Sequence, residues 1–288
     1  MQPLLLDAEL YYLYDGTLEG MFTAIFQAFT MRQYPENIVT EEGLQLSLLG
    51  SYVPVHTDLD RAARVRDSII TRLGTRLYYD ISVVFLSDDE RKGGVILRYL
   101  QYMLKAGRRA RLHLAHPAVN AFEELHRVVA QEAHYMRQFV RFAHTESGVY
   151  YSKINPKACI VPLVMDHFAA RFNVQPFMLY DANHQMAGVF DTQTWWLVDT
   201  TEQELTPPAH SKIEDTFQAL WQTFFDTIAI EERRNPTCQR NFMPKRFWGN
   251  MCEQIPPEMR TQRPMTETPT AAAKRLASTE HRVPLLTS

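Results

Sequence analysis

The chain has 288 residues, of which 45% are hydrophobic, enough to bury a core in one large domain or two small ones. Its formal net charge of −3 identifies no partner by bulk electrostatics. The first twelve residues contain two acids and no base, and the longest uncharged stretch, 43–57, is too short and polar to cross a bilayer, so we expect a cytoplasmic protein without membrane segments.

Helices dominate the predicted N-terminal half. The run YLYDG is typical of a strand that ends in a turn, and the apolar residues of TLEGMFTAIFQAF then follow the spacing of an amphipathic helix. We expect a loop around Pro35 and Pro54. TDLD, from Thr57, has the spacing of a capping box and predicts a helix that ends at Gly74. Further helices are predicted on either side of SDDERKGG and over PAVNAFEELHRVVAQEAHYM.

The apolar spacing changes in the second half. QFVRFAHT and GVYYSKI alternate as strands do, whereas VPLVMDHFAARF has helical spacing from Pro162. Three short apolar runs, FMLYD, AGVFD and WWLVD, predict an antiparallel meander with one face against the helices. IEDTFQALWQTFFDTI predicts another helix, and PKRFWGNMCEQI is the last element that we expect to be ordered.

These elements predict an α+β fold. Residues 1–130 form a mainly helical part, and residues 131–255 form one compact unit in which helices pack on an antiparallel sheet of about five strands. Residues 256–288 contain five prolines and no Phe, Trp or Tyr, so we predict a disordered C-terminal tail.

The stretch HYMRQFVRF, which begins at His134, alternates ionisable and aromatic side chains. A helix would place His134, Arg137 and Arg141 on one face, whereas a strand would align Arg137, Phe139 and Arg141. We favour a helix that ends just before Arg137 and a strand beyond it, because Phe-Val-x-Phe has high strand propensity. The two arginines would then flank Phe139 and bind a stacked base with its phosphates. The alternative is an exposed face whose arginines pair with acids.

The same region is basic as a whole. Residues 101–172 carry ten Lys and Arg residues against five Asp and Glu residues, a balance that favours a phosphate-bearing partner or, alternatively, a solvated basic face. In DHFAAR, His167 and Arg171 are one helical turn apart and would converge on an anion. The candidates for acid or base catalysis are His134, His167 and Asp166.

A second basic and aromatic segment, ERRNPTCQRNFMPKRFW, lies near the C-terminal end of the expected fold. Alternating cations and aromatic rings beside a helix start suit a nucleic-acid backbone. The other interpretation is a lid whose aromatic residues pack on the core while its charges face water. The nucleic-acid-binding candidates of this segment are Arg234, Arg240, Lys245, Arg246 and Trp248.

The sequence favours neither a metal site nor a cofactor. Cys159, Cys238 and Cys252 form no C-x-x-C pair, and HLAH, from His113, lacks a carboxylate at helical spacing. The chain also lacks the glycine-rich phosphate loops and the Gly-x-Ser-x-Gly motif of elbow serines. We therefore predict no metal and no cofactor.

Four motifs occur in the order YLYDGTLEGMFTAIFQAF, EAHYMRQFVRF, VPLVMDHFAARF and LWQTFFDTIAIEERRNPTCQRNFMPKRFW. In combination, over about residues 10–255, they resemble a bacterial family of DNA metabolism or DNA repair proteins with a domain of unknown function. The resemblance implies a companion radical-SAM protein with a DNA-binding helix-hairpin-helix, and some relatives are fused to a uracil-DNA glycosylase-type domain. It supplies no catalytic residues. Two positions depart from the pattern: Phe177 replaces an expected tryptophan, and His184 stands where relatives often have arginine.

The residues and the resemblance together predict a DNA-binding accessory protein in DNA metabolism or repair that acts with a radical-SAM partner. Single-stranded and double-stranded DNA both stay open as ligands. A second hypothesis is a glycosylase-like repair enzyme that acts on a flipped or damaged base, with His134 or His167 as acid or base. A third is a protein-interaction module whose exposed aromatic residues dock the companion without binding DNA.

Overall fold

A computed structural model describes residues 9–41, 50–201 and 207–255. The chain divides into two compact units, Met1–Glu253 and Gln254–Ser288, and the first carries the fold. The predicted tail, residues 256–288, lies outside the described residues. No helix in the described ranges is both long enough and apolar enough to span a bilayer.

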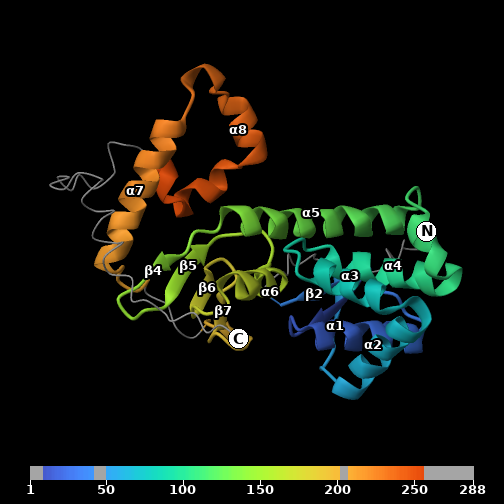
Figure 1. Cartoon of the computed structure of the whole chain (residues 1–288). Helices are drawn as coiled ribbons and strands as arrows, with labels where there is room; N and C mark the ends of the chain where they lie inside the picture. The colour runs from blue at the N-terminus through green and yellow to red at the C-terminus, as the bar shows by residue number, and fades with distance from the viewer. Residues whose placement is uncertain (1–8, 42–49, 202–206, 256–288) are drawn as a thin grey trace, which may run out of the picture. The chain divides into compact units, whose positions relative to one another are not determined.

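The N-terminal half is mainly helical, as predicted, and also contains a small sheet (Figure 1). The sheet has the strand order β2-β1-β3, and both outer strands run parallel to β1. The elements are β1 (Glu9–Tyr14), α1 (Leu18–Met31), β2 (Asn37–Thr40), β3 (Gly50–Pro54), α2 (Leu59–Leu73), α3 (Thr75–Phe85), α4 (Lys92–Ala106), the 3-10 helix η1 (Arg108–Leu112) and α5 (Pro117–Phe139).

The expected loop around Pro35 and Pro54 was wrong in part, because β2 and β3 occupy this region. Each strand is too short to display a period, and its hydrogen-bond partner β1 is distant in sequence. The helix start at TDLD was correct, but Asp58 caps it by accepting hydrogen bonds from the backbone N–H groups of Asp60 and Arg61. The helix ends at Gly74, whose φ of 101° favours glycine.

The second half contains a five-stranded sheet in the order β4-β5-β6-β7-β8. All neighbouring strands are antiparallel except β5 and β6, which are parallel because α6 connects them. The elements are β4 (Ala143–His144), β5 (Tyr150–Ile154), α6 (Val161–Phe172), β6 (Phe177–Asp181), β7 (Met186–Phe190), β8 (Trp195–Asp199), α7 (Lys212–Ile228), η2 (Glu231–Arg233), α8 (Pro236–Phe242), η3 (Lys245–Asn250) and η4 (Cys252–Gln254). The α+β class, the number of strands and the β6-β7-β8 meander are therefore confirmed.

The predicted strand from Arg137 was wrong, because α5 continues to Phe139 and β4 contains only Ala143 and His144. The helix persists because Val129, Ala133 and Met136 continue its buried stripe into a hydrophobic cluster shared with α6 and the five-stranded sheet. This packing outweighs the local strand propensity of Phe-Val-x-Phe.

The helix α5 runs past α3 and α4 as well as α6 (Figure 1), and it contributes residues to two hydrophobic clusters. Val119, Phe122 and Leu125 of its N-terminal half join the cluster built by α1 to α4 and the three-stranded sheet. The C-terminal half of the helix packs in the second cluster. The helix α5 thus connects the two halves of the first unit.

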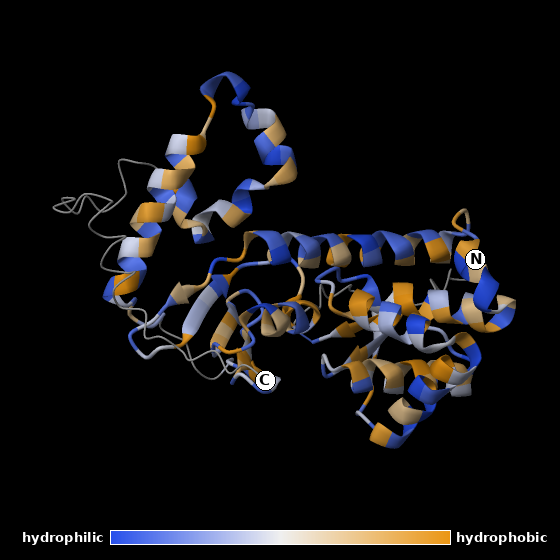
Figure 2. Cartoon of the chain, in the orientation of Figure 1, coloured by the Kyte–Doolittle hydropathy of each residue, from blue (hydrophilic) through white to orange (hydrophobic). Residues whose placement is uncertain are grey.

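By contrast, α7 presents an apolar face to solvent. Hydrophobic and hydrophilic residues alternate along it in Figure 2, and Phe217, Trp221 and Phe224 are 50%, 43% and 52% exposed. Its cap is regular, because the Ser211 hydroxyl accepts a hydrogen bond from the N–H of Glu214. The helix is therefore well specified locally but covers little of the core with its apolar residues.

The close approach of α4 to β2 at Gly93 generates a prediction. A Cβ atom at Gly93 would lie 2.8 Å from the Cβ of Ile38 and still closer to its carbonyl oxygen. We expect Gly93→Ala to lower the free energy of unfolding by about 2 kcal/mol, although alanine is the better helix former. Urea unfolding followed by circular dichroism measures this. Gly249→Ala, whose added Cβ meets no atom within 4 Å, is the control. Equal stability of the two variants would contradict the predicted clash.

Candidate functional site

Two predicted binding residues, Arg137 and Arg171, and the catalytic candidate His167 lie where the last turn of α5 meets α6. Nη2 of Arg137 donates a hydrogen bond to the carbonyl oxygen of Leu163 at 2.8 Å, which holds this guanidinium on the first turn of α6. His167 and Arg171 lie one turn apart farther along α6, and all three side chains belong to exposed residues. We call Arg137, His167 and Arg171 the α5–α6 basic cluster.

Arg137 and Arg171 both lie close enough to His167 to affect its protonation. The pKa of His167 is lowered by partial burial and by the positive charges of Arg137 and Arg171. These effects therefore favour the neutral form of the imidazole. An anion bound between the two guanidinium groups would oppose this effect and favour protonation of His167.

The other residues of HYMRQFVRF have structural partners. Nε and Nη2 of Arg141 donate to Oε1 of Glu253, at 3.1 and 2.7 Å, and the Glu253 side chain is only 2% exposed. Phe139 packs against Tyr135 and Phe247, with ring centroids 5.9 and 5.8 Å apart. The predicted sheet face on which Arg137 and Arg141 flank Phe139 therefore does not form. For Arg141, pairing with an acid was the alternative interpretation.

In the C-terminal basic segment, Arg246 is the most constrained cation. It pairs with the buried carboxylate of Glu132 on α5, and its guanidinium carbon lies 4.4 Å from the ring centroid of Phe247. Glu132 also accepts a hydrogen bond from the backbone N–H of Lys157 at 3.0 Å. Arg246 therefore ties the C-terminal segment to α5.

The remaining candidates of that segment lie at its surface. Arg234 pairs with Glu231 at 3.0 Å, and Arg240 donates to the carbonyl oxygen of Pro236 and the hydroxyl of Thr237, within its own helix. Nζ of Lys245 lies 5.9 Å from the ring centroid of Trp248, whose Nε1 donates to the carbonyl oxygen of Met243 at 3.0 Å. Arg234, Arg240 and Lys245 are exposed, and their binding role stays a prediction.

The three catalytic candidates have separate partners. His134 shares a hydrogen bond of 2.7 Å with Gln138 on the outside of α5, and Oδ1 of Asp166 accepts one of 2.7 Å from Nε1 of Trp195 on β8. In the part of the chain that the structure describes, no hydrogen bond joins any two of His134, Asp166 and His167. These three candidates therefore do not form a hydrogen-bonded acid and base pair.

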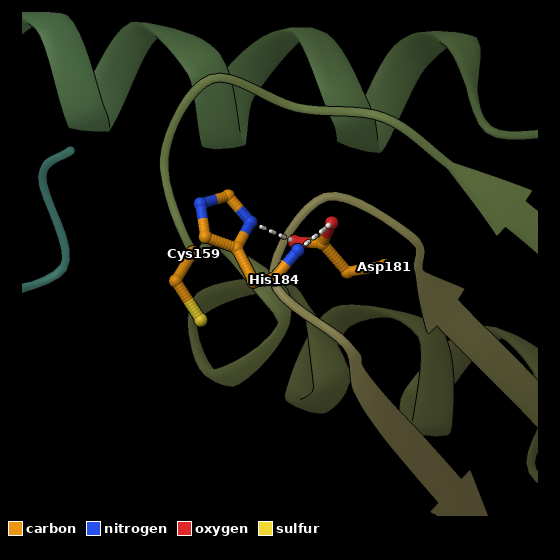
Figure 3. Close-up of side chains that lie close together, drawn as sticks. All are labelled: Cys159, Asp181 and His184. Carbon is orange, nitrogen blue, oxygen red and sulfur yellow. Dashed lines mark hydrogen bonds and ion pairs between the residues drawn. The ribbon is translucent and has the colours of Figure 1, made fainter. Parts of the chain in front are cut away.

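A partly buried network that the sequence did not predict lies at the turn between β6 and β7 (Figure 3). Nδ1 of His184 lies 2.6 Å from Oδ2 of buried Asp181, and its Nε2 lies 2.8 Å from Oδ1 of Asp88, which precedes α4. The other Asp181 oxygen accepts the backbone N–H groups of Asn183 and His184. His184 thus joins the five-stranded sheet to the helical half, as a clasp between two carboxylates.

Cys159 adds a third type of metal-ligating atom to this network. Ligand atoms of Cys159, Asp181 and His184 all lie within 4.8 Å of one another, and such a donor set is acceptable to Zn²⁺. However, both ring nitrogens of His184 already contact carboxylates, and burial raises the pKa of the Cys159 thiol to about 12. A metal ion would have to displace protons from both side chains, so the residues present fit an ionic clasp better than a metal centre.

The protonation of His184 follows from its partners. Burial lowers its pKa, but the hydrogen bonds and negative charges of Asp181 and Asp88 outweigh burial and raise the pKa to about 9. His184 is therefore charged at neutral pH. A positively charged group at this position is also what the arginine of the resembled family would provide.

These features define an α+β protein with an exposed basic cluster at a helix crossing and a partly buried ionic clasp. A family model described as "Domain of unknown function (DUF4130)" matches residues 90–253, more than half of the chain, and the protein belongs to this family. The match includes the α5–α6 basic cluster, Asp181, His184 and both arginine–glutamate pairs. No curated protein and no solved structure matches the chain.

The Arg141–Glu253 pair predicts a structural role for Arg141. Arg141→Ala removes a guanidinium from a buried carboxylate, and we expect a loss of about 2 kcal/mol in the free energy of unfolding, moderated because Arg141 is partly exposed. Denaturant unfolding measures the loss. Arg137→Ala, which breaks only a hydrogen bond to a carbonyl oxygen, is the matched control and should cost less than about 1 kcal/mol. Wild-type stability of the Arg141 variant would count against the structural assignment.

The His184 clasp predicts a pH dependence of stability. Because its pKa is raised to about 9 in the folded protein, the stabilisation is complete below the ordinary histidine pKa and disappears as the pH rises through 9. We expect the stability difference between wild type and His184→Ala to decrease by on the order of 2 kcal/mol between pH 6 and 10. Urea unfolding at several pH values tests this, with His134→Ala as a surface control. A difference independent of pH would refute the charged clasp.

Proposed function

We propose that the protein is a cytoplasmic DNA-binding accessory factor in DNA metabolism or repair and acts with a radical-SAM partner. The observation that carries this proposal is the convergence of Arg137 and Arg171 around His167 at an exposed helix crossing. Two guanidinium groups beside an imidazole suit a phosphodiester, because each guanidinium presents a planar fork of donors to phosphate oxygens.

The charge of the wider segment supports this assignment. Residues 101–172 have twice as many Lys and Arg residues as Asp and Glu residues, although the surplus lies outside α5 and α6, which together carry three arginines and four acids. Arg141 and Arg246 pair with buried carboxylates, whereas Arg137 donates to a backbone carbonyl oxygen. Binding would be mainly electrostatic and would show little preference for base sequence.

The exposed face of α7 favours a second candidate function, that of a protein-interaction module. Phe217, Trp221 and Phe224 form an aromatic surface that the described fold leaves accessible. In this alternative the protein would bind the radical-SAM companion through α7 and would have no affinity of its own for DNA. The two functions are separated by measuring DNA binding of the isolated protein and co-purification with the partner in Phe217→Glu and Arg137→Ala variants.

DNA binding should depend on the α5–α6 basic cluster. We expect the double variant Arg137→Ala, Arg171→Ala to bind single-stranded or double-stranded DNA at least about 10-fold more weakly at low salt, and to reduce the slope of log affinity against log salt by roughly 2. Fluorescence anisotropy with labelled DNA over a salt series measures both quantities. Arg64→Ala, Arg66→Ala removes two exposed arginines of α2 and is the charge-matched control.

Direct contact between DNA and the cluster can be detected through the pKa of His167. DNA phosphates at the cluster would raise the pKa of His167 from its lowered value, which can be followed by NMR titration of the imidazole signals. DNA affinity that is absent at low salt, or equal in the cluster and control variants, would overturn the proposal. The interaction module would be favoured if the wild type does not bind DNA and the cluster variant still co-purifies with the partner.

A further inference from the structure

A second concentration of arginines lines a pocket of about 280 Å³ in the helical half. Its wall contains Arg76 from the start of α3 and Arg108, Arg109 and Arg111 from η1, together with apolar side chains that include Leu77 and Met103. Among the residues that the structure describes, none that lines it is acidic. The residues that line the pocket all precede α5 in the sequence, whereas Arg137 lies in the last turn of that helix.

The turns that build this pocket are specified by sequence. Gly74 ends α2 and Gly107 ends α4, and their φ values of 101° and 80° fall in the region that favours glycine. Nε and Nη2 of Arg108 donate to the last carbonyl groups of α2, at Arg72 and Thr71, at 2.9 and 3.0 Å. Arg108 therefore holds η1 against the end of α2 and forms one fixed wall.

The four arginines differ in how many hydrogen bonds and ion pairs they make within the protein. Arg76 pairs with Asp80 at 3.0 Å and lies over the ring of Tyr79, and Arg108 is held by the two carbonyl groups. Within the described residues, the side chains of Arg109 and Arg111 make neither a hydrogen bond nor an ion pair with an acid. Both are exposed. Like charges that face one hollow repel one another, so an anion bound there would be strongly favoured.

We propose that this pocket binds a phosphate monoester attached to a small group that is partly apolar. A terminal phosphate carries up to two charges and three acceptor oxygens, which suits several guanidinium donors better than a carboxylate does. The apolar side chains of Leu77 and Met103 provide contact for the attached group. The volume, near the lower end of about 300–1,000 Å³ for small-molecule sites, limits the ligand to roughly the size of a nucleotide.

Two sources share this chemistry: a free nucleoside 5′-monophosphate and the 5′-phosphorylated end of a nucleic-acid strand. Isothermal titration of the full chain with adenosine 5′-monophosphate, adenosine and inorganic phosphate tests the first source. Anisotropy with one oligonucleotide, prepared with and without a 5′-phosphate, tests the second. We expect each phosphorylated probe that binds to do so at least about 10-fold more tightly than its unphosphorylated counterpart.

The variant Arg109→Ala, Arg111→Ala should lose at least about 10-fold in affinity for the phosphorylated probe. Arg109→Lys, Arg111→Lys keeps the charge but loses the planar forks, and we expect intermediate affinity. Arg64→Ala, Arg66→Ala is the matched control with wild-type affinity, and circular dichroism verifies that each variant is folded. Binding of the monophosphate alone, or preference for the phosphorylated strand end, supports the proposal and identifies the source.

The proposal is overturned if no phosphorylated probe binds, if adenosine binds as well as its monophosphate, or if the Arg109 and Arg111 variant keeps full affinity. Its failure is distinguishable from failure of DNA binding at the α5–α6 basic cluster. Removing Arg137 and Arg171 should leave monophosphate binding unchanged, and removing Arg109 and Arg111 should leave the binding of unphosphorylated DNA within about 3-fold of wild type, as expected for sites without shared residues.

Discussion

The structure depends on α5, because this single helix must bury apolar residues in two hydrophobic clusters. Its 23 residues, about 35 Å of helix, carry Val119, Phe122 and Leu125 into one cluster and Val129, Ala133 and Met136 into the other. Ending the helix before Arg137 would withdraw its last turn from α6. The continuous helix therefore fixes Arg137 beside Leu163 and creates the crossing at which the α5–α6 basic cluster forms.

Two buried carboxylates determine which arginines form ion pairs. Glu132 faces inward, and a buried carboxylate requires a cation and hydrogen-bond donors, which Arg246 and the Lys157 amide supply. Glu253 is buried in the same way and takes Arg141. The two pairs bind the C-terminal segment to the body of the fold, whereas Arg137 contacts only a carbonyl oxygen and keeps its charge available.

Local patterns and nonlocal contacts explain what the sequence could predict. The amphipathic helices, Gly74 as a helix end and the β6-β7-β8 meander depend on neighbouring residues, and all were predicted. The strands β2 and β3 and the parallel pairing of β5 with β6 depend on distant segments, and were not. The pairing of His167 with Arg171 along one helix was visible in the sequence, but the approach of Arg137 to them required the α5–α6 crossing.

The partners of the candidate site residues were hidden for the same reason. Arg141 and Glu253 are 112 positions apart, Arg246 and Glu132 are 114, and His184 and Asp88 are 96. A single sequence contains no signal for such pairs. A basic residue beside aromatic residues can therefore be interpreted either as a DNA contact or as the partner of a buried acid. The alternative for HYMRQFVRF paired its arginines with acids on an exposed sheet face, whereas Arg141 lies outside the strands and pairs with a buried acid.

Shape then separates the two basic sites that remain. The α5–α6 basic cluster is exposed at a helix crossing, where a continuous phosphodiester backbone with one charge per phosphate has access. The arginine pocket is partly apolar and lined by four arginines, which favours a compact terminal group of higher charge. The two sites share no residue, so the two sets of arginines can be varied independently.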